Sequence, residues 1–293
     1  MTATLRTAMA LAMLMCAAHR AHGQSLTFAA QESDQPIEVT ADGGIEWQQN
    51  KKLFIARGNA RAVQGEVSVT ADELVAHYRE TDGETQVYRV DAQGSVKIAS
   101  AEETATGAAA VYDFDKAVLV VEGAPVTLTN ADGAVTANGT LQYWSEERVA
   151  VAEGDAQARD RTRSIRADKL VAYFAPPADG AHNGDGPLKR GRFTLVRGEG
   201  NVRLTTDKET AVGDRGEYNL ENGIAKLEGS VKITRENNQL NGGFAIVDTN
   251  AGTSRLFGSA REAGVAAPGV EARVKALLAP APQATPSAVP GGR

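Results

Sequence analysis

The side chains best suited to catalysis or metal binding are few in this sequence. Only two of its four histidines, His77 and His182, lie beyond the first 23 residues. Neither stands in a spacing typical of a metal site or of a catalytic triad. His77 occupies a position that is aromatic in other copies of a repeat described below, so we interpret it as a substitute for tyrosine. The sequence therefore predicts no cofactor and no metal, and favours a protein that is not an enzyme.

Short polar side chains recur in a second pattern, at Asp42, Asp72 and Asp168, with Asn138 in the matching position. A ladder of aspartates binds calcium in β-roll arrays, but the Gly-Gly-x-Gly-x-Asp nonapeptide of those arrays is absent. Such side chains also bond to the nearby backbone where a strand bends. We favour this structural role for the four residues.

Carboxylates and cations recur around a repeated glycine. Glu122 and Glu153 each precede a glycine, which leaves open an enzyme that acts on polysaccharides, although equivalent repeat positions favour a scaffold role. Basic residues stand three positions after the glycine, where they suit either lipid phosphates or plain solvation: Arg61, Lys97, Arg203, Lys232 and Arg261. We favour solvation, and expect the acidic residues just before the glycine to pair with them.

The elements that carry these residues form a repeat with seven copies. Each copy has an aromatic or equivalent residue followed by a glycine: Trp47 and Gly58, His77 and Gly94, Tyr112 and Gly123, Tyr143 and Gly154, Tyr173 and Gly200, Tyr218 and Gly229, Val247 and Gly258. Five copies have the same spacing, whereas two contain turn-rich insertions, at 80–84 and 176–187. Insertions of this kind are typical of hairpin tips, so the repeat unit is predicted to be a β-hairpin. A fixed period of about 30 residues indicates a stacked array.

Alternating hydrophobicity around each glycine predicts which face of the hairpin is buried. The residues two before and two after the glycine are all apolar or glycine, and their neighbours are mostly polar. A period of two is typical of a half-buried strand, and a shift of one residue would expose the whole apolar set. The glycine shares the inward face, which indicates a bulge, a bend or a close approach to its backbone.

Together these patterns predict an all-β protein of seven repeated β-hairpins, with about 14 strands divided roughly equally between two facing sheets. Inward apolar side chains are the candidates for a lipid groove: Val39, Ile45, Val96, Ile98, Leu119, Val121, Val202, Leu204, Leu227, Val231 and Ile233. The aromatic row has two interpretations, as cross-strand stacking near the turns, which we favour, or as the rim of that groove.

The two ends of the chain differ from the repeats. Residues 1–23 are predicted to be a signal peptide, with an apolar run at 8–18 and cleavage near Gly23, which would also remove Cys16, the only cysteine. Lipidation of Cys16 is disfavoured because Met15, immediately before it, is not small. Residues 24–36 are a polar lead-in, 37–262 form the β-array, and 263–293 are an Ala/Pro-rich tail predicted to be disordered, with one short helix around 270–278. The net charge of −6 excludes a basic footprint for nucleic acid.

The recurring motif resembles the LptA/OstA family of periplasmic lipopolysaccharide-transport proteins. The resemblance rests on Ala167-Asp168 followed by Tyr173, and on the run from Glu228 to Ile233, and it covers about residues 37–260. It implies an elongated two-sheet OstA-like β-jellyroll, open along one side like a taco, whose interior holds the acyl chains of lipid A. It also implies a periplasmic location, head-to-tail assembly into a bridge, and LptC-like inner-membrane and LptD-like outer-membrane partners.

Three hypotheses follow from the sequence. The leading one is a periplasmic bridge component that carries lipopolysaccharide between the membranes, sheltering its acyl chains between two β-sheets. The second is a structural β-array of the envelope that binds no lipid. An LptC-like partner of the same bridge is an alternative within the first hypothesis. An enzyme that acts on polysaccharides is the third.

Overall fold

A computed structural model describes residues 37–81, 83–101, 103–131, 133–175, 193–265 and 273–277. The expected signal peptide, the lead-in and the insertion at 176–187 lie outside these residues. Within them the chain forms 18 β-strands and one short 3-10 turn, η1 (Gln49–Lys51). The strands of the N-terminal part are β1 (Glu38–Thr40), β2 (Ile45–Gln48), β3 (Leu53–Gln64), β4 (Val67–Thr81), β5 (Glu84–Ala99), β6 (Glu103–Asp113), β7 (Val118–Glu122), β8 (Val126–Asn130) and β9 (Ala134–Ala137). Those of the C-terminal part are β10 (Thr140–Trp144), β11 (Val149–Arg159), β12 (Ser164–Phe174), β13 (Phe193–Thr205), β14 (Thr210–Asn219), β15 (Ile224–Arg235), β16 (Asn238–Asp248), β17 (Thr253–Phe257) and β18 (Lys275–Leu277).

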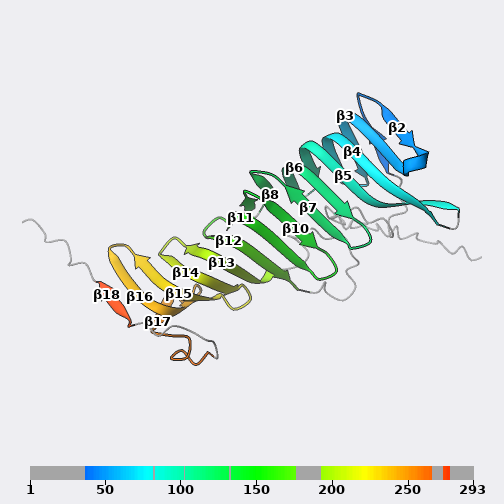
Figure 1. Ribbon diagram of the computed structural model, residues 1–293. Helices are drawn as coiled ribbons and strands as arrows, with labels where there is room; N and C mark the ends of the chain where they lie inside the picture. Colours follow the sequence, from blue (N-terminus) through cyan, green and yellow to red (C-terminus); the bar gives the residue numbers. More distant parts are fainter. Residues whose placement is uncertain are drawn as a thin grey trace, which may run out of the picture.

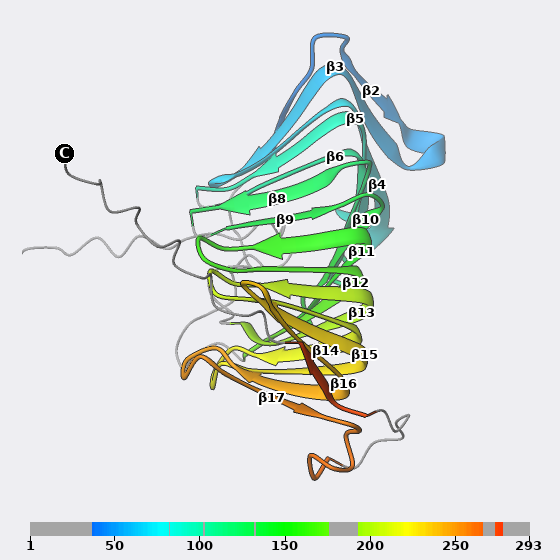
Figure 2. The ribbon, with the colours of Figure 1, turned by 90° about the vertical axis from the view of Figure 1, so that its left-hand side faces the viewer.

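The strands stack side by side into one elongated sheet. Strands β3, β4, β5 and β6 each pair antiparallel with the next, as do β11 to β16, so the chain zigzags from one end of the molecule to the other. Figure 1 shows the stack running from β2 and β3 at one end to β17 and β18 at the other. Figure 2, turned by a right angle, shows the same order from top to bottom.

The long strands bend near their middles, at the repeated glycine in β3, β5, β11, β13 and β15 and opposite that glycine in their partner strands. The pairing register shifts across this point in eight pairs of neighbouring strands, for example between Arg57 and Ala60 and between Glu199 and Val202. The glycines there have positive φ, +73° at Gly200 and +98° at Gly229, a conformation that glycine adopts at little cost. The predicted bend is confirmed.

The bends divide the sheet into two facing layers, which we call the first layer (the strand segments level with β2, β7, β10 and β17) and the second layer (the segments level with β1, β8, β9 and β18). The all-β, two-layered fold is as expected, but the strands are not divided between two sheets. Nearly every long strand crosses from one layer to the other because its bulge turns it without ending it.

We call each passage of the chain from one layer to the other a crossing. Where the bend interrupts the pairing, one crossing consists of two short strands. Strands β7 and β8 together pair with β6, and β9 and β10 together pair with β11. Counted as crossings, the described strands give the expected seven hairpins. In the third copy the inward position falls on Val126, which is 1% exposed, and not on Pro125, because this break holds one residue more than the others.

The apolar core is thin and lies between the layers in two clusters. One is formed by β3 to β8 and the other by β9 to β16, and many of the buried side chains are small, such as Ala60, Ala156 and Ala245.

The two predicted hairpin-tip insertions, at 80–84 and 176–187, have different outcomes. On either side of position 82 the chain pairs as a hairpin, with Glu80 opposite Thr85 and Thr81 opposite Glu84, whereas 176–187 lie outside the described residues.

The C-terminal tail departs from expectation at 275–277. These residues form β18, which pairs with Gln239–Asn241 of β16, so the predicted helix is wrong for them. The reason is that β17 pairs only with Phe244–Asp248 of β16 and leaves the rest of that edge for another strand. Apart from 263–265 and 273–277, the predicted disordered tail lies outside the described residues.

Candidate functional site

The inward apolar rows form the candidate site. Eight of the eleven predicted groove residues are at most 5% exposed and belong to the two core clusters: Val96, Ile98, Val121, Val202, Leu204, Leu227, Val231 and Ile233. Leu119 is partly buried and packs against the first cluster. These side chains come from both layers, with Leu119, Val121 and Leu227 on the first layer and the others on the second. The predicted inward face is therefore the face that the structure buries.

The other two predicted groove residues lie elsewhere. Val39 on β1 is 39% exposed and Ile45 on β2 is 53% exposed. Both belong to the last crossing at the N-terminal end of the stack, where no further strand of the described chain covers them. With Ile37 and Trp47, at 43% and 56% exposed, they form an apolar patch that we call the N-terminal end patch.

Two small apolar hollows remain between the layers, and they meet at Leu119. One is lined by residues of β6, β7, β8, β10 and β11, among them Ala105 and Tyr143. The other is lined by residues of β4 to β7, among them Ile98 and Tyr112. Each has room of about 20 Å³, enough for roughly one water molecule. An acyl chain therefore needs the layers to move apart before it can enter.

Tyrosines line the first-layer rim of this interior, which supports the second interpretation of the aromatic row for three of its members. Burial raises the pKa of Tyr112 to about 12, with smaller contributions from Tyr143 and Asp113. Burial also raises the pKa of Tyr143, and the carboxylate of Glu103, on the second layer, adds to the effect. Tyr218 is 8% exposed and faces inward as well.

The aromatic residues pack mainly on phenylalanines. Tyr112 meets Phe114 edge to face with ring centroids 4.6 Å apart, and Tyr143 meets Phe174 at 5.9 Å. Tyr173 lies on the outer face, under the guanidinium of Arg197. The row of tyrosines is thus divided between the two faces of the first layer and is not one continuous stack.

Polar side chains connect the two layers across the rim in the C-terminal part. Arg163, in the turn between β11 and β12, donates a hydrogen bond to the hydroxyl of Tyr218 on β14, with an N–O distance of 2.5 Å. Ser254 on β17 donates to Glu209 at 2.6 Å, and Arg235 donates to the carbonyl of Gly252 at 3.3 Å. Sequence reasoning missed these bridges because the partners are up to 55 residues apart and meet only once the sheet has bent.

Aspartates bond across the bends, but the two predicted ones, Asp42 and Asp168, bond to asparagine side chains and not to the backbone as the sequence favoured, and Asp214 was not predicted. Asn59 donates to Asp42 at 2.8 Å, and Asn201 donates to Asp168 at 2.9 Å. Asp214 accepts a hydrogen bond from the backbone N–H of Ser230 at 3.2 Å. Across the described residues, no group of three or more His, Cys, Asp or Glu side chains is arranged to hold a metal ion.

Four of the five predicted outward basic residues fall into one row, which also contains Arg166 and does not contain Arg261. Arg61, Lys97, Arg166, Arg203 and Lys232 occupy successive cross-strand positions on the second layer, separated by Thr70, Thr106, Thr127, Thr136, Gln157 and Val212.

We expected the acidic residues just before the glycines to pair with this row, and the expectation is wrong for Glu153 and Glu228. Glu153 pairs with Lys169 at 2.8 Å and Glu228 with Arg215 at 3.4 Å, because each acid lies beside cations of its own layer and the bend separates it from the row.

The remaining candidates for chemistry lie on the outer face. His77 forms a 2.7 Å contact with Asp91, and Asp91 also pairs with Arg89. The buried aromatic side chain of this copy is instead Tyr78, which is 2% exposed and accepts a hydrogen bond from Trp47. A register shift between His77 and Tyr78 accounts for the difference.

Comparisons with known proteins identify two similar chains. Part of the chain, 102 residues or 33% of its length, is 26% identical to an uncharacterized protein of Rhizobium meliloti (strain 1021), and the match spans about half (54%) of that relative. The crystal structure of LptH, the LptA homologous periplasmic component of the lipopolysaccharide transport device from Pseudomonas aeruginosa, aligns with 86% of this chain and 99% of its own, at 14% identity and a TM-score of 0.21. None of the helices in the described residues is long and apolar enough to cross a membrane.

A family model gives the assignment. The model of the LptA/(LptD N-terminal domain) LPS transport protein family matches the chain twice in succession, over residues 38–141 and 134–253. Together the two matches cover most of the chain and almost the whole of the bent sheet, and the boundary between them coincides with the boundary between the two core clusters. This chain therefore belongs to the LptA/(LptD N-terminal domain) family of LPS transport proteins, which transport lipid and do not catalyse a reaction.

Proposed function

We propose that this protein is a periplasmic bridge component that binds lipopolysaccharide and carries it from the inner to the outer membrane. The observation that carries the proposal is the apolar lining between the two layers, which runs from β3 to β16 as two clusters that Val135 and Leu141 both contact. Burial of hydrocarbon is favourable by about 0.8 kcal/mol per methylene, so one acyl chain of a dozen carbons gains on the order of 10 kcal/mol. This gain is available to offset the separation of the layers.

The hollows beside Leu119 leave apolar space between the layers, so we infer that acyl chains first enter there. Lining residues such as Val121 and Leu128 are apolar, and Tyr112 and Tyr143 stand at the rim. Opening needs motion of one layer against the other. The glycines at the bends are the positions at which the backbone most readily supplies it.

Site-specific crosslinking tests this proposal. A photo-reactive residue at Leu119, Val121, Val231 or Ile233 should capture lipopolysaccharide in cells, and the same residue at outward Lys232 should not. Lys232 is a matched control because it lies between two of the test positions on the same strand. Equal capture at inner and outer positions contradicts an interlayer site.

The narrowness of the hollows favours one alternative, an envelope β-array with a permanently closed interior and no lipid. Purified mature protein separates the two functions. If it binds no fluorescent acyl probe and carries no lipid by mass spectrometry when isolated from its native envelope, the array is the correct description and the transport proposal is wrong.

The ends of the stack support the proposed partners. The N-terminal end patch exposes apolar side chains beside the unpaired edges of β1 and β2, and the C-terminal end exposes Leu277, at 64%, on β18. Unpaired edges readily accept another strand. We propose that these ends join head to tail with further copies, with an LptC-like inner-membrane protein and with an LptD-like outer-membrane protein. Cysteine crosslinking between the two ends, and copurification with each partner, are the measurements that check this.

A further inference from the structure

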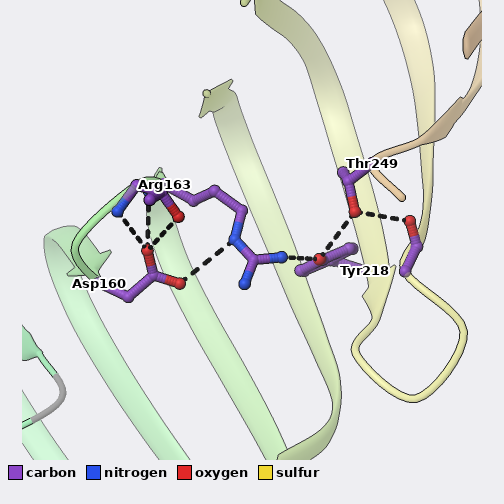
Figure 3. A network of polar contacts seen from close by, with 6 residues as sticks. Asp160, Arg163, Tyr218 and Thr249 are labelled. Atoms are coloured by element: carbon purple, nitrogen blue, oxygen red, sulfur yellow. Dashed lines mark hydrogen bonds and ion pairs between the residues drawn. The ribbon is translucent and has the colours of Figure 1, made fainter. Parts of the chain in front are cut away.

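Arg163 occupies an unusual position, because a cation there reaches across the mouth of the interior. It lies in the turn between β11 and β12, on the rim of the second layer, and its guanidinium contacts Tyr218 on the rim of the first. The guanidinium carbon lies 5.8 Å from the centre of the Tyr218 ring. Figure 3 shows this contact and the hydrogen bond that the Tyr218 hydroxyl shares with Thr249.

The turn holds Arg163 in place. Asp160 accepts hydrogen bonds from the backbone N–H groups of Thr162 and Arg163, both at 2.8 Å, and its second oxygen accepts from Nε of Arg163 at 3.3 Å. Burial opposes the charge of Asp160, but these hydrogen bonds outweigh it and keep the pKa of its carboxyl below the usual value. Asp160 therefore remains charged and fixes one edge of the guanidinium.

The other edge of the guanidinium is available to a ligand. A guanidinium carries five N–H donors, and the side chain of Arg163 is 38% exposed. Its contact on this edge is a neutral phenol hydroxyl, which is a weaker acceptor than an anion. Hydrogen bonds from arginine to phosphate are roughly twice as strong as neutral ones and are often bidentate.

We propose that Arg163 is an exchangeable phosphate site at the mouth of the interior. In the lipid-free protein it donates to Tyr218 and helps to keep the layers together. When an acyl chain enters between the layers, Arg163 leaves Tyr218 and binds the phosphate of the same lipid's headgroup. The inference rests on the proposed lipid binding and assigns it a residue that recognises the headgroup.

Two lipids that differ only in phosphate test the inference. The probes are lipid A and the same lipid after enzymatic removal of its phosphates, titrated onto the mature full-length chain. Arg163→Gln should weaken binding of the phosphorylated lipid by about tenfold or more, the effect of losing one hydrogen bond to a charged group. Binding of the dephosphorylated lipid should stay within about twofold of wild type, since the hydrocarbon contacts remain.

Three further variants complete the test. Arg161→Gln changes an exposed arginine of the same turn and should alter neither affinity. Arg163→Lys keeps the charge but not the planar fork, so it should retain part of the preference for phosphate. Tyr218→Phe removes the competing hydroxyl, so the phosphorylated lipid should bind as tightly as before or more tightly.

Several outcomes would overturn the inference. Equal losses for both lipids in Arg163→Gln would make Arg163 only a structural clasp, and no loss for either would remove its role. Tight binding of inorganic phosphate by the lipid-free protein, abolished in Arg163→Gln, would assign the site to free phosphate and not to a headgroup. If the wild-type chain binds neither lipid, the proposed function itself fails.

Discussion

The carboxylate of Asp168 lies directly against Gly200. A β-carbon on Gly200 would stand 2.1 Å from Oδ2 of Asp168. A β-carbon added to Gly94 would lie at the same distance from Oδ2 of Asp72, and one added to Gly229 at the same distance from Oδ2 of Asp214. Two features thus require glycine at these bends, the positive φ and the aspartate that fills the space of a side chain. The recurring aspartates and glycines of the sequence therefore act together, because each aspartate occupies the space that the glycine leaves empty.

Replacement of Gly200 should therefore destabilise the fold through a defined contact. Gly200→Ala should lower the free energy of unfolding by roughly 2–4 kcal/mol, from backbone strain together with the clash. The control is Gly83→Ala, which has φ of +85° but no atom within 4 Å of the added carbon, and should cost less. Asp168→Ala combined with Gly200→Ala should recover the part due to the clash. Denaturant unfolding of all three variants measures these differences, and equal losses in the two single variants would contradict the argument.

Filling the hollows should block acyl binding. Leu119 lines both of them, so Leu119→Trp should weaken binding of a fluorescent acyl probe by about tenfold, at a cost of about 1–3 kcal/mol in stability from overpacking. Val120→Trp places the same ring on the opposite face of β7 and should leave the affinity unchanged. Fluorescence titration with a circular dichroism check of the fold measures both, and an equal effect of the two variants would place the probe elsewhere.

Alkaline pH should destabilise the fold through Tyr112. The folded pKa of about 12 lies above the usual 10, because burial disfavours the phenolate. The folded state therefore holds this proton more tightly than the unfolded state. The protonated Tyr112 side chain makes its full contribution to the free energy of unfolding below pH 10. This contribution, about 2–3 kcal/mol in all, is lost as the pH rises to 12. Tyr112→Phe should flatten the stability profile over this range in denaturant unfolding at pH 9 to 12. An unchanged slope would show that other groups cause the loss.

A charge in the N-terminal end patch should prevent association. Ile45 is 53% exposed beside the unpaired edge of β2, so Ile45→Lys should reduce self-association and strand addition. Leu220→Lys is the matched control, since Leu220 is 38% exposed in the turn after β14, away from the N-terminal end patch and not on an edge strand. Sedimentation at increasing concentration measures the effect. Association that survives Ile45→Lys, or that is lost equally in both variants, would contradict a contact through this patch.

The sequence predicted the repeat and its buried face because both depend on local alternation. Val96, Val202 and Val231, each two residues after a glycine, lie on the buried face as predicted. The alternation failed where an extra residue changed the phase. Pro125 and His77 occupy the predicted positions by counting, but Val126 and Tyr78 occupy them in space. A bulge leaves little trace in composition, and its effect is seen only in the pairing.

The contacts between layers could not be predicted from the sequence. Arg163 and Tyr218 are 55 residues apart, and nothing in the turn that carries Arg163 indicates which strand it will face. The two layers were predicted, but the continuity of the strands from one layer to the other was missed, because a strand that ends and a strand that bends show the same alternation on both sides of a glycine. The bend itself was predicted, but its consequence, one sheet folded on itself, depends on hydrogen bonds that continue past it.

Every described crossing of this sheet pairs only with the crossings before and after it. A gene that gains or loses one hairpin would therefore lengthen or shorten the protein by about 10 Å, twice the spacing of neighbouring strands, while the remaining contacts stay as they were. The two consecutive family matches in this chain fit such growth by duplication. The length of the molecule can therefore change in steps of one hairpin without disturbing the contacts of the hairpins that remain.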